Sequence, residues 1–211
     1  TEVQNGTLTL NAGSSLGSGT LTMNALGGVA TLELNESASV SSLVSGASPS
    51  ANSIIAIADG KTLTVNETTT RTFGTTVGSS TFAINGAGAL TMAGSGELIL
   101  DGTNNYTGLT SVTAGTLTAN KAGAISSSAA ISAGATLNLK DNQTLTSLAG
   151  AGSVVIADTK TFTLNNSVTS NFAGSFTATG TTAFTKSGSG TLNLSGASTG
   201  LSRDVTLGAG T

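Results

Sequence analysis

The chain contains no cysteine, no histidine and no tryptophan, and it has one proline in 211 residues. Without cysteine there can be no disulfide framework and no thiolate metal site. A hydrolytic triad normally uses histidine as its base, so the common form of that chemistry is excluded as well. No other residue pattern indicates a catalytic site, and we expect no cofactor and no bound metal.

Charge and aromatic side chains are also scarce: they make up 8% and 3% of the chain, and the net charge is -3. A nucleic-acid partner is not expected, because phosphates would need a basic cluster that the sequence lacks. The apolar fraction of 37% is too high for a typical disordered chain. Because the sequence starts and stops within repeated phrases, we interpret residues 1–211 as a single segment of a longer repeat array.

The dominant pattern is threonine, an apolar residue, a polar residue and a second apolar residue. Its period of two predicts half-buried β-strands with the apolar side chains inward and threonine outward. The clearest runs are residues 7–10, 20–23, 31–34, 54–57, 62–65, 81–84, 89–92, 136–139, 154–156, 161–164, 191–194 and 205–207. Residues 121–130 and 37–52 lack the pattern, so we expect loops or weak strands there, and a loop insertion at 37–52.

Short β-units that cannot bury a face alone must stack on one another. A β-sandwich would need a thick core of large side chains, whereas a parallel β-helix needs only one or two aliphatic residues per strand and tight corners rich in glycine and asparagine. The chain offers the second set, so we predict an all-β, right-handed parallel β-helix (a β-solenoid) of the pectin-lyase-like kind. Its size corresponds to about seven to ten coils and a rod roughly 35 to 50 Å long.

Residues 94–118 resemble the passenger-associated repeat of bacterial autotransporters, Gly-x-Gly-Thr-Leu-x-Leu-x-Gly-x-Asn-x-Tyr-x-Gly-x-Thr-x-Val-x-x-Gly-x-Leu. The positions matched to it are Gly94, Gly96, Leu98, Leu100, Gly102, Asn105, Tyr106, Gly108, Thr110, Val112, Gly115 and Leu117. A second copy begins with Gly188, Gly190, Leu192 and Leu194, and it departs from the pattern at residues 198–200.

The resemblance implies a passenger segment that is extracellular or exposed on the bacterial cell surface. The resemblance itself identifies no activity. The exposed neutral hydroxyl and amide side chains favour a non-enzymatic rigid stalk and adhesin, with a host-cell surface protein, a glycan or a second stalk as partner. Membrane attachment would come only through a C-terminal translocator barrel. Two alternatives stay open: a carbohydrate-active β-helix enzyme, which polysaccharide cleavage would reveal, and a threonine-rich ice-binding solenoid, which thermal hysteresis would reveal.

The residues most able to carry chemistry all have simpler structural interpretations. The carboxylates are scattered, and the close pair Glu33 and Glu36 is expected at a solvated strand edge. Asp101 and its neighbouring asparagines suit a tight turn more than a Ca²⁺ site. We expect Tyr106 to pack over a corner, with a ligand-stacking role as the alternative. The phenylalanines are expected in the core: Phe73, Phe82, Phe162, Phe172, Phe176 and Phe184.

Overall fold

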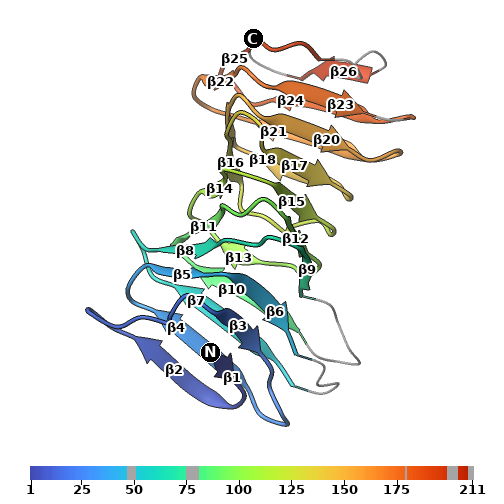
Figure 1. Cartoon of the computed structure of the whole chain (residues 1–211). Helices are drawn as coiled ribbons and strands as arrows, with labels where there is room; N and C mark the ends of the chain where they lie inside the picture. Colours follow the sequence, from blue (N-terminus) through green and yellow to red (C-terminus); the bar gives the residue numbers. More distant parts are fainter. Residues whose placement is uncertain (47–50, 75–80, 179, 199–203, 209–211) are drawn as a thin grey trace.

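Figure 1 shows the computed structural model of the chain, which describes all residues except 47–50, 75–80, 179, 199–203 and 209–211. The chain rises from its N-terminal end as a stack of coils, and its described part contains strands but no helix. Every strand pairing is parallel and joins one coil to the next, as between Glu97–Leu100 and Thr116–Ala119. The predicted all-β parallel solenoid is therefore confirmed, while its right hand and its likeness to pectin lyases stay predictions.

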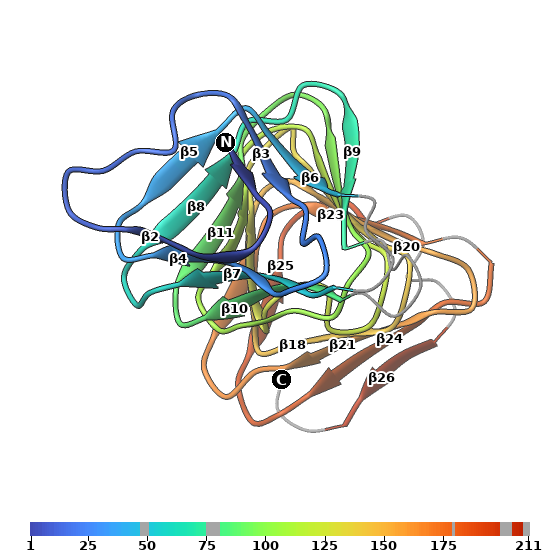
Figure 2. The same cartoon turned by 90° about the horizontal axis from the view of Figure 1, so that it is seen from below.

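Successive strands rotate through three faces, which the view along the stack in Figure 2 shows end-on. The first face holds β1 (Glu2–Val3), β3 (Thr20–Met23), β6 (Ser42–Ser45), β9 (Thr70–Phe73), β12 (Glu97–Leu100), β15 (Thr116–Ala119), β17 (Thr136–Leu139), β20 (Ser153–Ile156) and β23 (Ser175–Ala178). The second face holds β2 (Gly6–Leu10), β4 (Ala30–Leu34), β7 (Ser53–Ile57), β10 (Phe82–Gly86), β13 (Asn105–Tyr106), β18 (Gln143–Leu145), β21 (Thr161–Asn165), β24 (Ala183–Ser187) and β26 (Asp204–Leu207). The third face holds β5 (Ala38–Val40), β8 (Thr62–Val65), β11 (Ala89–Met92), β14 (Thr110–Val112), β16 (Ser128–Ile131), β19 (Ser147–Gly150), β22 (Ser170–Phe172) and β25 (Leu192–Leu194).

The third face contributes eight strands to one sheet, so the described chain makes about eight coils. At the spacing of parallel strands, the first and last of them lie roughly 34 Å apart. The coils differ in length: Asn85 pairs with Asn105 in the next coil, whereas Ser53 pairs with Phe82. The strands keep their register although the coils differ in length.

The core is a narrow column of aliphatic and aromatic side chains that stack on their equivalents in the next coil. One such column on the first face contains Leu98, Leu117, Leu137, Val154 and Phe176, all fully buried. The six phenylalanines are all buried, as predicted. Four of them, Phe162, Phe172, Phe176 and Phe184, form one cluster with ring centroids 5.1 to 5.9 Å apart.

Of the loops or weak strands expected at residues 37–52, the described part holds two strands, β5 and β6, which belong to regular coils, and the loop insertion stays a prediction. Three inward aliphatic side chains, Ala38, Val40 and Leu43, are enough to fix these strands in the narrow core. Pro49 lies outside the described residues. Within residues 121–130, a turn leads into the regular strand β16.

Outward threonines are present on every face, as the period-two pattern predicts. However, the Thr-x-Thr pairs are divided among the faces: Thr7 and Thr9 lie on the second, Thr20 and Thr22 on the first, and Thr62 and Thr64 on the third. A short row in register forms on the second face, where Thr144, Thr163 and Thr185 are consecutive partners. These Thr-x-Thr pairs therefore do not form the single aligned array that a threonine-rich ice-binding solenoid would need.

Candidate functional site: the repeat coil and the strand gap

The glycines of the first repeat copy lie at corners, where consecutive coils approach one another most closely. A Cβ atom on Gly94 would overlap the carbonyl oxygen of Glu67 in the coil below, and a Cβ atom on Gly108 would overlap that of Gly88. The same crowding by backbone of a neighbouring coil applies at Gly96, Gly102 and Gly115. These positions need glycine because any side chain would push two coils apart.

The apolar positions of the first copy all point into the core. Leu98, Leu100, Val112 and Leu117 are fully buried. In the second copy the same motif is rotated by one face: its first strand, β24, lies on the second face, whereas β11 in the first copy lies on the third. Gly188 and Gly190 again lie against the backbone of the coil below, while Leu192 is half-buried and Leu194 is 42% exposed. The motif therefore specifies a corner and its flanking strands, and it is not tied to one face.

The asparagine that acts in this coil is Asn104, and the assignment of Asn105 to the motif is wrong. Asn105 is exposed, whereas Asn104 is 8% exposed. The Asn104 Oδ1 atom accepts a hydrogen bond from the N–H of Ile84 at 2.7 Å, and its Nδ2 atom donates to the carbonyl oxygen of Ala124 at 2.7 Å. One side chain thus joins three consecutive coils. Counting the repeat pattern from Gly102 would have identified Asn104.

Tyr106 is also a coil-joining residue. Its side chain is 2% exposed, so it cannot stack on a ligand at the surface. Its hydroxyl lies 2.6 Å from Thr110 Oγ1, which lies 2.9 Å from Ser126 Oγ in the next coil. Burial raises the pKa of Tyr106 to about 12, and the hydrogen bonds only partly offset this, so the hydroxyl is neutral at physiological pH.

Near Asn104 and Tyr106 the second face lacks one strand, and side chains of the adjacent coils hold the segment that replaces it. The sheet of the second face ends at β13, a new sheet begins at β18, and residues 120–127 between them form turns. Asn104 holds this segment from the coil below. Its backbone N–H donates a hydrogen bond to the carbonyl oxygen of Gly123, and its Nδ2 atom donates one to the carbonyl oxygen of Ala124. Gln143 binds it from above, because its Nε2 atom donates to the carbonyl oxygen of Lys121 at 2.6 Å. We call the missing position the strand gap.

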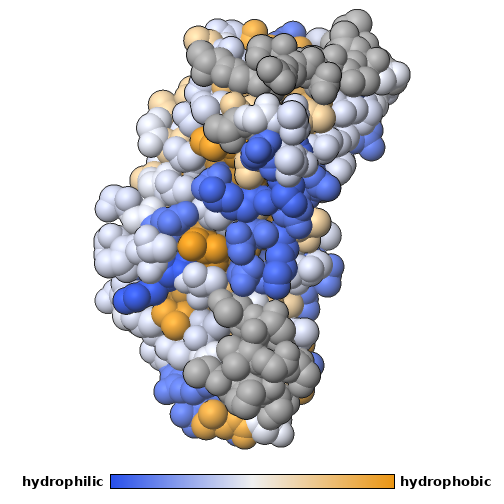
Figure 3. Space-filling view, turned by 90° about the vertical axis from the view of Figure 1, so that its right-hand side faces the viewer, coloured by the Kyte–Doolittle hydropathy of each residue, from blue (hydrophilic) through white to orange (hydrophobic). Residues whose placement is uncertain are grey.

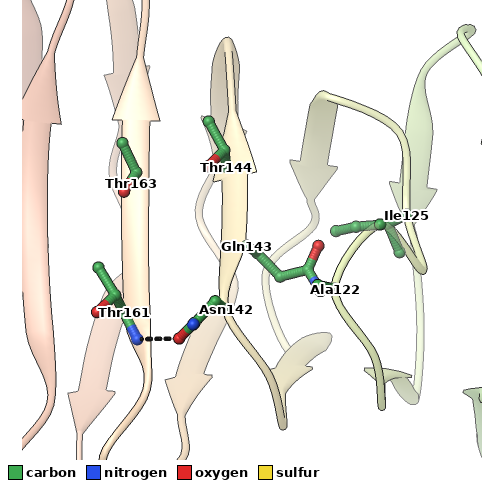
Figure 4. A pocket seen from close by; sticks show the side chains of 8 residues that line it. Ala122, Ile125, Asn142, Gln143, Thr144, Thr161 and Thr163 are labelled. Atoms are coloured by element: carbon green, nitrogen blue, oxygen red, sulfur yellow. Dashed lines mark hydrogen bonds between the residues drawn. The ribbon is translucent and has the colours of Figure 1, made fainter. Parts of the chain in front are cut away.

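The strand gap leaves a groove of about 480 Å³ on the second face, the gap groove. It is lined by Ala122, Gly123, Ile125, Asn142, Gln143, Thr144, Thr161 and Thr163. Figure 4 shows Thr144 and Thr163 side by side on β18 and β21, with Gln143 extending across the gap toward Ala122. None of the lining residues carries a charge.

Hydrogen bonds and ion pairs join consecutive coils beside the groove residues Ala122 and Asn142. Figure 3 shows that one side of the stack carries a band of hydrophilic surface. Lys160 Nζ lies 3.0 Å from Asp141 Oδ1, and Lys121 Nζ lies 3.9 Å from Asp101 Oδ1. The hydrogen bond from Lys160, followed by the N–H of Asn142, lowers the pKa of Asp141. The charges near the groove are therefore largely paired with each other.

The described residues contain no group of three or more Asp or Glu side chains that could hold a metal ion. Glu33 and Glu36 do not act together: Glu33 accepts a hydrogen bond from Thr9, whereas Glu36 pairs with Lys61 at 3.2 Å. Asp101 Oδ1 accepts one hydrogen bond from Asn120 Nδ2, in the next coil, rather than forming an oxygen cage with its own neighbours. Among the described residues, no helix is long and apolar enough to span a membrane.

Comparison with known families gives a match to the passenger-associated-transport-repeat at residues 90–119 and 184–211. These ranges include the two glycine corners described above. No curated protein and no solved structure matches the chain. The two repeats form part of the parallel solenoid. Together, the repeat matches and the solenoid fold support the assignment of the chain as an autotransporter passenger β-helix.

Proposed function

We propose that the chain is a rigid, non-enzymatic stalk of a secreted or surface-exposed passenger and that its sides are adhesive. The observation that supports this most directly is the column of stacked core side chains on the first face, together with the continuous eight-stranded parallel sheet of the third face. A solenoid in which every coil is bonded to the next resists bending along its length. Its sides present neutral hydroxyl and amide groups, which suit contact with a glycan, a host-cell protein or a second stalk.

The low charge of the outer rows supports adhesion for an electrostatic reason. On the third face, the outward row contains Ser39, Thr64, Thr91, Ser111, Ala130 and Ala149. A surface of this kind has little like-charge repulsion to keep it away from another surface. It also holds the small side chains that allow close approach.

The test uses beads coated with the purified chain. We expect the beads to adhere to cultured epithelial cells or to one another, and beads coated with albumin to do neither. A variant with Ser111→Glu, Ala130→Glu and Ala149→Glu serves as the matched control for bead-to-bead contact, because it adds three negative charges to one face of a chain whose net charge is already -3. Absence of both adhesion and aggregation would contradict the adhesive function, and cleavage of any member of a polysaccharide panel would contradict the non-enzymatic one.

A further inference from the structure

We propose that the gap groove is a binding site for a neutral oligosaccharide. This inference rests on the proposed adhesive function and specifies one partner class and one site for it. The groove exists because residues 120–127 replace the strand that would otherwise fill the second face between β13 and β18. Its volume of about 480 Å³ lies within the range of small-molecule sites.

Two amide side chains in the groove are held in fixed orientations that complement a pair of sugar hydroxyls. Asn142 Oδ1 accepts a hydrogen bond from the N–H of Thr161 at 2.8 Å, so its Nδ2 atom is available as a donor. Gln143 is 4% exposed, and its Nε2 atom is bonded to the carbonyl oxygen of Lys121, so its Oε1 atom is available as an acceptor. Figure 4 shows that this oxygen points into the space between β18 and the turn that carries Ile125.

A sugar hydroxyl both donates and accepts hydrogen bonds, so a vicinal pair can use one fixed donor and one fixed acceptor at once. The orientation of both amides is set before any ligand arrives, which reduces the ordering cost of binding. The hydroxyls of Thr144 and Thr163 add two adaptable partners, and neither is hydrogen-bonded to another described residue. The side chain of Ile125, which is 5% exposed, provides an apolar contact for the C–H groups of a sugar ring.

The charge pattern selects a neutral ligand. No lysine or arginine lines the groove, so a uronic acid or a sialic acid would lose hydration of its carboxylate without gaining a cationic partner. The two lysines that adjoin lining residues are paired with carboxylates: Lys160 Nζ lies 3.0 Å from Asp141 Oδ1, and Lys121 Nζ lies 3.9 Å from Asp101 Oδ1. A neutral sugar faces no such cost.

The experiment titrates the 211-residue chain with neutral trisaccharides of glucose, galactose or N-acetylglucosamine and with sialyllactose as the acidic probe, and it detects binding by NMR and calorimetry. We expect binding of at least one neutral probe. Thr163→Val is expected to weaken it by about three- to tenfold, because a hydrogen-bonding partner is lost without a change of shape. The matched control is Thr185→Val, one coil farther along the same row and outside the lining of the groove, which is expected to leave binding unchanged.

Three results would overturn the inference. The first is that no neutral probe binds at about 10 mM, an order-of-magnitude ceiling for weak sites. The second is that sialyllactose binds more tightly than every neutral probe, and the third is that the Thr163→Val and Thr185→Val variants lose affinity equally. If the beads still adhere or aggregate while neutral sugars do not bind, the groove site is refuted and the adhesive function stands. If sugars bind but the beads neither adhere nor aggregate, the adhesive function is refuted and the groove site stands.

Discussion

Replacing Asn104 with alanine tests whether the repeat joins coils through this one amide. The side chain is 8% exposed and bonds the N–H of Ile84 and the carbonyl oxygen of Ala124, each at 2.7 Å. Asn104→Ala leaves both backbone groups without a partner in a corner that has little access to water. Each unsatisfied group costs about 1 to 3 kcal/mol, so we expect a loss of about 2 to 5 kcal/mol in the free energy of unfolding.

The matched control for this variant is the neighbouring residue. Asn105 is exposed on the outer side of β13, so Asn105→Ala is expected to change stability by less than about 0.5 kcal/mol. Asn104→Asp separates the two bonds, because a carboxylate can still accept from Ile84 but faces the Ala124 carbonyl with a second oxygen. We therefore expect Asn104→Asp to be destabilised as well.

Urea unfolding followed by circular dichroism gives the stabilities, and native-state hydrogen exchange shows where the loss occurs. Coils of a solenoid can open separately, so the exchange experiment is needed beside the global one. We expect faster exchange at the amide of Ile84 and in residues 120–127 in the Asn104 variants. Equal stability of the Asn104→Ala and Asn105→Ala variants, or unchanged exchange at these amides, would refute the coil-joining role of Asn104.

Three further predictions address the corners, the core and the buried tyrosine. Gly96→Ala is expected to cost about 1 to 3 kcal/mol in urea unfolding through overlap with backbone of the coil below, whereas Gly19→Ala, which meets no atom within 4 Å, should be neutral; equal effects would contradict the close-approach argument. Phe176→Ala is expected to cost about 3 to 5 kcal/mol, because its ring contacts Phe162, Phe172 and Phe184, and a loss below about 1 kcal/mol would contradict this packing. Tyr106, the sole tyrosine, should ionise near pH 12 in an absorbance titration at about 295 nm, above the ordinary value of about 10. Since its folded pKa is the higher one, its contribution to stability is present below about pH 10 and is lost as the pH rises through about 12, and Tyr106→Phe should remove that loss.

The fold could be predicted from the sequence because each coil repeats one simple rule, an apolar residue inward and a threonine outward. That rule located β3, β8 and β17 with correct bounds. It missed β5 and β16, whose inward positions include alanine, because small side chains give little contrast between the two sides of a strand. In a stack, such weak strands are fixed by the coils above and below them.

The strand gap could not be predicted from the local pattern, because the absence of one strand from one face depends on how the coils align. Residues 120–127 resemble other glycine- and serine-rich turns of this chain. Only the pairing of neighbouring coils shows that they replace a strand of the second face. The groove residues come from three separate stretches, 122–125, 142–144 and 161–163, and no motif connects them.

The central claim is that the chain is a stack of parallel coils in register, and distances along one outward row test it most directly. The chain has no cysteine, so pairs of spin labels can be attached to introduced cysteines without background. The row on the third face runs through Ser39, Thr64, Thr91, Ser111, Ala130 and Ala149. With one label at Ser39 and the other at Ser111, Ala130 or Ala149, the backbone separations should be about 14, 19 and 24 Å, one strand spacing per coil. Distances that do not increase by one such step from each pair to the next would contradict the solenoid.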